Sequence, residues 1–248
     1  FMGVNSLKSQ AEYMKDMFSV DLLKGHFENY LIIFKNFKIG QYLFNTLLVT
    51  VLKLVFTMPL AIFASYAFAK LRFRGKNAMY PLIISAMFIP FQVIMIPVYT
   101  MLTKLHMIDT YRGLILVTGT IGIPSSIMLL SSSFRSIPNE LLEAAAIDGC
   151  GYFRKIFHIM IPMGKPAIAI CTIMGFISSW NDLLPPMVII KSVNKRLVMP
   201  ALDGLVSMYN ADTPFQLTGI LIAAVPAIAI YLILSKQIIM GISAGSTK

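Results

Sequence analysis

The polar residues best suited to chemistry gather between residues 140 and 162 of a chain that is otherwise largely apolar. The stretch ELLEAAAIDGCGYFRKIFHIMIP carries carboxylates at Glu143 and Asp148 and cations at Arg154 and Lys155. A carboxylate on the free face of a rigid helix can form a charge-assisted contact with another protein. Two roles therefore stay open for Glu143: such a contact, or an interaction with the helix dipole near the start of its helix.

A second polar group, Trp180-Asn181-Asp182, follows an apolar run and contains the only tryptophan. An aromatic ring beside an amide and a carboxylate can stack on a sugar face while its neighbours bond the hydroxyl groups. A tryptophan near the outer end of a helix is also typical of the aromatic belt at a membrane surface. Both interpretations stay open for Trp180.

Lys53 is ionisable and lies well inside an apolar run, and Gln92 lies close to Pro90 in another. A charge inside a membrane is costly, so such a residue is expected to face the helix bundle or a wet cavity. The alternative for Lys53 is that its long side chain extends to the outer interface. Pro90 frees the carbonyl of Ala86, which is common beside cavities and in kinked packing helices alike. The candidate residues for a substrate path are Lys53, Gln92, Trp180, Asn181 and Asp182.

The sequence argues against metal, redox or nucleotide chemistry in this chain. Cys150 and Cys171 lack CxxC spacing, and His26, His106 and His158 are scattered, so no metal site is predicted. No G-x-x-x-x-G-K-S/T motif occurs, so the chain has no P-loop cradle for ATP. We therefore expect a non-enzymatic protein with no catalytic, cofactor-binding or metal-binding residues.

Composition indicates an integral membrane protein. Hydrophobic residues make up 57% of the 248 and charged residues 13%, and the mean hydropathy is +0.75, unlike soluble proteins. The formal charge of +10 arises from short basic clusters beside apolar runs, where Lys and Arg meet a membrane surface. No basic stripe interleaved with aromatic residues occurs, so nucleic-acid binding is not expected.

Five apolar runs are long enough to cross a hydrocarbon layer about 30 Å thick, which takes roughly 20 helical residues. Backbone groups cannot stay unpaired in lipid, and the runs are too long for barrel strands. The predicted fold class is therefore all-α, a polytopic membrane helix bundle. The expected spans are 43–69, 79–102, 113–134, 166–186 and 215–236. We expect residues 1–41 to form an external or interfacial segment, and residues 42–248 to form the transmembrane domain, which includes the cytoplasmic loop 135–165.

The orientation follows from the basic run Lys70-Leu71-Arg72-Phe73-Arg74-Gly75-Lys76, which should stay in the cytoplasm. Alternation of the spans then places the loop 135–165 and the C-terminus inside. The same alternation places 1–41, 103–112 and 187–214 outside.

Residues 140–162 are too charged for a span, since each central charge costs about 2.5–3.5 kcal/mol in a membrane. Pro138 suits a first helical turn, and Gly149 suits a left-handed position that ends the helix. A second helix follows and stops at Pro162. The expected apolar faces are Leu141, Leu142, Ala145 and Ala146 on the first helix, and Tyr152, Phe153, Ile156, Phe157 and Met160 on the second. Pattern alone favours an interfacial helical hairpin.

The hairpin resembles the EAA loop of ABC importer permeases, written E-A-A-x3-G-x9-I-x-L-P. The matching residues are Glu143, Ala144, Ala145, Gly149, Ile159 and Pro162. Ile161 stands where that family prefers leucine. Asp148 before the glycine resembles the sugar-importing branch, although Cys150 replaces its common alanine.

The resemblance extends from about residue 40 to the end of the chain. The segments similar to the maltose-type permease subunit are Asn45-Thr46-Leu47, Tyr66-Ala67-Phe68-Ala69, 71–76, 162–166, Trp180-Asn181-Asp182 and 241–245. Members of this family carry one more N-terminal helix, so we expect six spans in the full-length protein.

The resemblance implies a permease subunit that forms half of the path of an ATP-driven sugar or oligosaccharide importer in a bacterial plasma membrane. It implies as partners a second permease subunit, two ATPase subunits that bind ATP and Mg²⁺, an external sugar-binding protein and the lipid bilayer. The helix before Gly149 would dock in a groove of an ATPase subunit. The coupling residues so implied are Glu143, Ala144, Ala145, Asp148, Gly149, Ile159 and Pro162.

The alternative function is a self-sufficient secondary transporter of a small polar solute. Such proteins are expected to carry paired intramembrane carboxylates or discontinuous repeats. Asp182 alone does not supply such a pair. The sequence does not identify the sugar.

Overall fold

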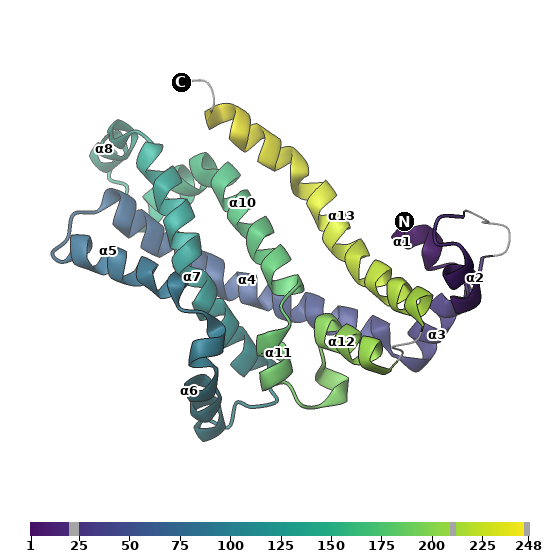
Figure 1. The fold of residues 1–248 in the computed structure, drawn as a ribbon. Helices are drawn as coiled ribbons and strands as arrows, with labels where there is room; N and C mark the ends of the chain where they lie inside the picture. Colours follow the sequence, from purple (N-terminus) through teal and green to yellow (C-terminus); the bar gives the residue numbers. More distant parts are fainter. Residues whose placement is uncertain (20–24, 209–211, 246–248) are drawn as a thin grey trace.

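The computed structural model describes residues 1–19, 25–208 and 212–245, and within these ranges the chain is helical without a β-strand. The helices are α1 (Met2–Asn5), α2 (Gln10–Lys15), α3 (Glu28–Asn36), α4 (Ile39–Lys70), α5 (Lys76–Ser85), α6 (Phe91–Lys104), α7 (Tyr111–Ser136), α8 (Asn139–Ile147), α9 (Tyr152–Lys155), α10 (Ile161–Trp180), α11 (Leu184–Ile189), α12 (Val198–Met208) and α13 (Thr213–Gly245). Figure 1 shows α8 at one end of the molecule and α1–α3 at the other.

Four helices are long and apolar enough to cross a membrane. They are Ile39–Lys70, Tyr111–Ser136, Tyr152–Trp180 and the first part of α13, Thr213–Ile230. The predicted span 79–102 is instead a bent pair, Lys76–Phe88 followed by Phe91–Lys104, with 97° between its halves. The predicted all-α membrane bundle is confirmed, with four crossing helices, or five if the bent pair is one span.

The break in this pair lies at Pro90, as predicted from its missing N–H group. Pro90 is the N-cap of α6 with extended backbone angles, and the Ala86 carbonyl accepts its bond from the Ile89 N–H, at 3.2 Å. Pro81 and Pro97 in the same apolar run lie inside α5 and α6 without ending them. One proline in three therefore ends a helix here.

The span predicted at 166–186 begins and ends earlier than expected. It runs continuously from Tyr152 to Trp180, with a π-helical turn at Ile156–Met160. The prediction that Pro162 stops the second helix of the hairpin is therefore wrong. Pro162 lies in the first turn of α10, where a missing N–H is tolerated, and the wider π turn before it accommodates the ring. Beyond Trp180, Pro185 and Pro186 begin the separate helix α11.

Close packing of α7 against its neighbours depends on small residues. A Cβ atom at Gly119 would lie 2.7 Å from the ring of Phe56 on α4, and one at Gly164 on α10 would lie 2.5 Å from the ring of Phe134. Across the α4–α7 contact, Thr57 Oγ1 donates to the Gly119 carbonyl at 3.3 Å. Small residues that let helix backbones approach, and hydroxyl groups that bond across them, are typical of membrane bundles.

The loops segregate to two ends as the predicted alternation requires. At one end, Lys70 Nζ donates to the carbonyl of Ile137 and to Asn139 Oδ1, joining the basic run to the start of α8. At the other end, Gln41 and Asn45 donate to the Asn194 carbonyl at 2.9 and 3.0 Å. The segments expected inside therefore share one end, and the start of α4 shares the other with the α11–α12 loop.

The N-terminal segment packs against the start of α13 at this second end. Ser6 Oγ and Tyr30 Oη are 2.7 Å apart, and Thr218 Oγ1 donates to the Ser6 carbonyl at 3.1 Å. The Thr213 N–H donates to Gln10 Oε1 at 3.0 Å. The described part of residues 1–41 thus forms α1, α2, α3 and the first turn of α4.

Candidate functional site

Gly149 ends α8 by adopting a left-handed conformation, as the sequence predicted. Its φ is +76°, and the N–H groups of Gly149 and Cys150 donate to the carbonyls of Ala146 at 3.0 Å and Ala145 at 2.8 Å. A Cβ atom here would meet nothing within 4 Å. The glycine is therefore required by the backbone angle and not by crowding. Pro138 lies one position before the helix, as its N-cap.

The expected apolar face of α8 is mostly turned outward. Leu142, 8% exposed, is its one buried side chain, and Ala145 is half-buried. Leu141 and Ala146 are exposed, and Ile147 is 88% exposed. Leu141 and Ala146 therefore face away from the bundle, and their burial at an interface stays a prediction.

The carboxylates of α8 and its end are free. Glu143 and Asp148 are exposed, and through their side chains neither forms a hydrogen bond or ion pair with any residue of the described ranges. Glu140, and not Glu143, occupies the first turn of α8. Since dipole interactions fade beyond the first turn, the position of Glu143 favours contact with another protein.

The second arm of the hairpin divides between core and surface. Ile156 and Met160 are buried with Phe134, Ile137 and Leu142 in one cluster. Tyr152, Phe153 and Phe157 are exposed on this chain, and the Phe63 ring lies edge-on to Phe153 and Phe157 at 6.0 and 6.2 Å. Of the remaining motif residues, Ala144 and Pro162 are exposed and Ile159 is half-buried.

Three of the residues predicted for a substrate path line one cavity of about 620 Å³ inside the bundle. Lys53 reaches it from α4, Gln92 from the first turn of α6, and Asp182 from the end of α10. Lys53 is only 7% exposed, so its side chain does not extend to the outer interface. Within the described ranges it has no hydrogen bond and no ion pair within 4 Å.

The polar lining of this cavity also includes hydroxyl groups that the sequence analysis missed. They belong to Thr118 and Ser125 on α7 and Ser178 on α10. Thr118, Gly122 and Ser125 follow each other at helical spacing, a signal that could have located this face. A second cavity of about 240 Å³ shares Lys53, Ser125 and Ser178 with the first, so the polar lining continues along the bundle.

Trp180 does not face this cavity. It is 2% exposed, stacks on Phe176 with ring centroids 5.4 Å apart, and donates from Nε1 to the Ala223 carbonyl at 3.0 Å. Asn181 donates to the Ile177 carbonyl at 2.9 Å and lies with Trp180 beside a separate space of about 430 Å³ against α12 and α13. Neither the sugar platform nor the membrane-belt interpretation of Trp180 agrees with this buried position.

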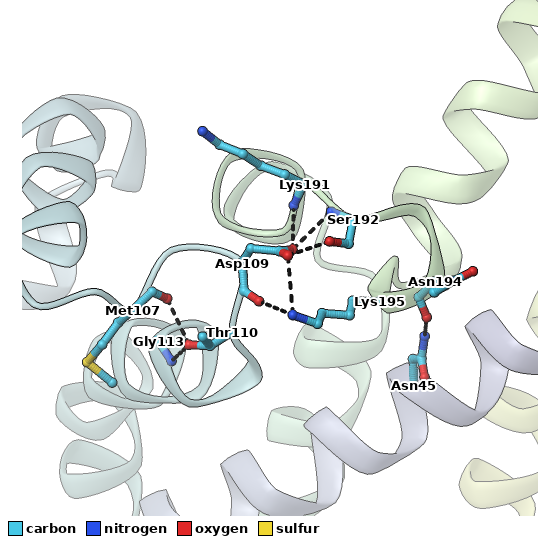
Figure 2. A network of polar contacts seen from close by, with 9 residues as sticks. All are labelled: Asn45, Met107, Asp109, Thr110, Gly113, Lys191, Ser192, Asn194 and Lys195. Carbon is cyan, nitrogen blue, oxygen red and sulfur yellow. Dashed lines mark hydrogen bonds and ion pairs between the residues drawn. The ribbon is translucent and has the colours of Figure 1, made fainter.

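Asp109 is the centre of a hydrogen-bond network between the α6–α7 and α11–α12 loops (Figure 2). The sequence analysis did not single out this residue. Its carboxylate accepts bonds from the Ser192 hydroxyl, from the Ser192 and Lys191 N–H groups at 2.9 and 3.0 Å, and from Lys195 Nζ at 3.2 Å. These donors, Ser192 above all, hold the pKa of Asp109 well below its ordinary value. The charged carboxylate therefore stabilises the end of the molecule opposite α8.

Among the described residues, no group of three or more His, Cys, Asp and Glu side chains could hold a metal ion. The candidate site comprises a free carboxylate and apolar surface at one end of the molecule, and a polar cavity in the bundle.

Comparison with known proteins agrees with this arrangement. Residues 57–242 match the family described as "Binding-protein-dependent transport system inner membrane component". The chain is 29% identical to the diacetylchitobiose uptake system permease protein of Streptomyces coelicolor, over 98% of this chain and 81% of that protein. It is also 29% identical to the arabinooligosaccharides transport system permease protein of Bacillus subtilis, over 99% and 88%.

In fold, the chain is similar to one from a bacterial ABC transporter involved in the import of the acidic polysaccharide alginate. The TM-score is 0.79 at 23% identity, covering 95% of this chain and 88% of that one. The family match alone spans more than half of the sequence. The chain therefore belongs to the family of binding-protein-dependent transport system inner membrane components.

Proposed function

We propose that this chain is a permease subunit of an ATP-driven carbohydrate importer and that α8 docks in a groove of a separate ATPase subunit. The main observation that supports this proposal is the exposed end of α8. Ile147 is 88% exposed beside the free carboxylates of Glu143 and Asp148. Apolar surface rimmed by charge is typical of a protein contact site. The coupling residues are those of the EAA motif, with Gly149 as the turn and Ile159 and Pro162 on the second arm.

The carbohydrate cargo is supported by the relatives, which are named for uptake of diacetylchitobiose and arabinooligosaccharides. The cavity suits such a cargo. Lys53, Gln92 and Asp182 supply charged and amide groups, and Thr118, Ser125 and Ser178 supply hydroxyls. Sugars bind through many hydroxyl hydrogen bonds of both polarities, and these side chains include donors and acceptors. We place the sugar path along this cavity.

The assembly that we propose contains a second permease subunit, two ATPase subunits and an external sugar-binding protein. ATP and Mg²⁺ bind to the ATPase subunits, since the sequence of this chain has no P-loop motif. The chain lies in a bacterial plasma membrane, with α8 and the C-terminus on the cytoplasmic side. The N-terminal segment and the hydrogen-bond network around Asp109 lie on the outer side.

Docking is tested by purifying the tagged chain in mild detergent and measuring how much of the ATPase subunit it retains. Glu143→Arg reverses the free charge, and Gly149→Val forces a β-branched residue to a φ of +76°. We expect each variant to retain about tenfold less ATPase subunit, a weakening of about 1.4 kcal/mol. Glu28→Arg reverses an exposed charge at the other end and should retain the wild-type amount.

Docking through α8 is disproved if both α8 variants fold, keep the ATPase subunit and support ATP-dependent uptake. Uptake driven by an ion gradient in vesicles without ATPase subunits would instead favour a secondary transporter.

A further inference from the structure

The last residue of α4, Lys70, holds the turn that joins α7 to α8. Its Nζ donates to the carbonyls of Arg135, at 3.4 Å, and Ile137, and to the side-chain oxygen of Asn139, at 2.8 Å. An ammonium group has three protons, and this arrangement offers an acceptor to each. One half-buried side chain therefore contacts the last turn of α7, the connecting residue and the first residue of α8.

This contact satisfies carbonyls at the end of α7 and in the turn that follows. The last carbonyls of a helix and the first N–H groups of the next need partners from outside the helix. Pro138, the N-cap of α8, has no N–H, and α8 has no side-chain cap at its start. A lysine that bonds the final carbonyls of a helix also interacts favourably with its dipole. Lys70 thus defines where α8 begins relative to the end of α4.

We infer that Lys70 is a positioning residue that transmits movement of α8 to α4 and so to the cavity. This inference rests on the proposed docking of α8. Lys53 lies on the same helix seventeen residues before Lys70, roughly 25 Å along the axis at about 1.5 Å per residue. A single helix therefore carries the contact to α8 at one end and a charged cavity residue in its middle.

The other contact between α8 and the bundle is apolar and less directional. Leu142 is buried in the cluster that contains Tyr66 of α4, Phe134 of α7 and Met160. Such packing resists separation of the elements but allows sliding, whereas three hydrogen bonds to one ammonium specify a position. Lys70→Met keeps an unbranched apolar stem of similar length and removes the three bonds. Arginine at this position keeps the charge and the donors.

The first measurement is hydrogen–deuterium exchange of the assembled complex in lipid nanodiscs. With Lys70→Met, we expect amides within residues 139–147 to exchange about tenfold faster, the order of magnitude for losing a charge-assisted hydrogen bond. Lys70→Arg should restore most of the protection. Arg74→Met is the matched control, because it removes an exposed charge from the loop that directly follows α4. Unchanged exchange in Lys70→Met would overturn the inference.

The second measurement separates positioning from structure. The external binding protein is loaded with diacetylchitobiose or arabinotriose, and its stimulation of ATP hydrolysis is compared with hydrolysis in its absence. We expect Lys70→Met to keep the ATPase subunits and the basal hydrolysis but to lose the stimulation by about tenfold. Lys70→Arg should regain it. Full stimulation in Lys70→Met would overturn the inference.

One further variant guards against misfolding, and the two α8 variants already described guard against failure of the docking proposal. Should Lys70→Met fail to assemble, Asn139→Ala removes one acceptor from the other side and should show the same changes to a smaller degree. An Asn139→Ala complex indistinguishable from wild type would then overturn the inference. If the docking proposal itself is wrong, the result is different: the Glu143→Arg and Gly149→Val variants then retain the ATPase subunit.

Discussion

At the residue scale, Lys53 and Trp180 show how burial decides between roles that residue type leaves open. Trp180 has the side chain best suited to a sugar, yet its ring is stacked on Phe176 and its N–H is bonded to a backbone carbonyl. Lys53 lies at the cavity without an ion-pair partner within 4 Å among the described residues. The Asp182 carboxylate shares this cavity and interacts with the cation from beyond ion-pair distance. A buried cation compensated only at such a distance costs stability, which makes a role in the transport path the better explanation.

Replacing Lys53 by methionine tests that role. We expect Lys53→Met to assemble, because the substitution keeps the apolar stem and leaves the half-buried Asp182 carboxylate in a cavity that is also lined by hydroxyl groups. Uptake of labelled diacetylchitobiose or arabinotriose by the reconstituted importer should fall about tenfold, the effect of losing about 1.4 kcal/mol of interaction. Lys165→Met, an exposed site on α10, is the control. Wild-type uptake by Lys53→Met would exclude the residue from the path.

At the element scale, contacts between glycine and aromatic residues set how closely α7 packs against α4 and α10. A Cβ atom at Gly164 would come within 2.5 Å of the Phe134 ring, and Phe134 is fully buried. The ring has no free volume to move into, so the helices themselves would have to separate.

The corresponding prediction compares two glycines of the same segment. Gly164→Ala should lower the free energy of unfolding by about 1–3 kcal/mol, the usual cost of overpacking a core. Gly151→Ala should have almost no effect, since its φ is −71° and no atom lies within 4 Å of the added methyl group. Thermal unfolding of the two purified variants measures the difference. Equal midpoints would contradict the packing argument, and Phe134→Leu should partly rescue Gly164→Ala.

Prolines at this scale act according to their surroundings. Pro90 ends a helix and redirects the chain by 97°, whereas Pro162 lies in a continuous span because a π turn precedes it. A missing N–H disrupts a helix only when no neighbouring geometry accommodates it.

At the scale of the whole molecule, the proposed orientation makes Cys150 a natural reporter of sidedness. Cys150 is half-buried at the end of α8, and Cys171 is buried within the bundle. A membrane-impermeant maleimide should label Cys150 in inside-out vesicles and not in intact spheroplasts, and the docked ATPase subunit should slow the reaction. A Cys150→Ser chain, which keeps only Cys171, should stay unlabelled. Labelling of spheroplasts would reverse the orientation.

The sequence by itself determined the fold class, the permease family and the turn at Gly149, since all three depend on local pattern. Apolar run length indicates a span wherever lipid is the solvent, and a φ of +76° favours glycine whatever surrounds it. The spacing of the EAA residues led to the permease family, which the family match confirms.

The tertiary structure alone decided which side chains share a space. Lys53 and Gln92 come from α4 and α6, and Asp182 comes from the connection after α10. They meet because of the break at Pro90 and the ending of α10 at Trp180. Which part of the apolar face of α8 the bundle itself covers was also decided by the structure, because periodicity shows which side chains can be buried and not how much surface a neighbour offers. The three hydrogen bonds of Lys70 and the hydrogen-bond network around Asp109 join residues that are 65 to 86 positions apart in the sequence. No local pattern encodes such contacts, because they exist only after the helices have packed.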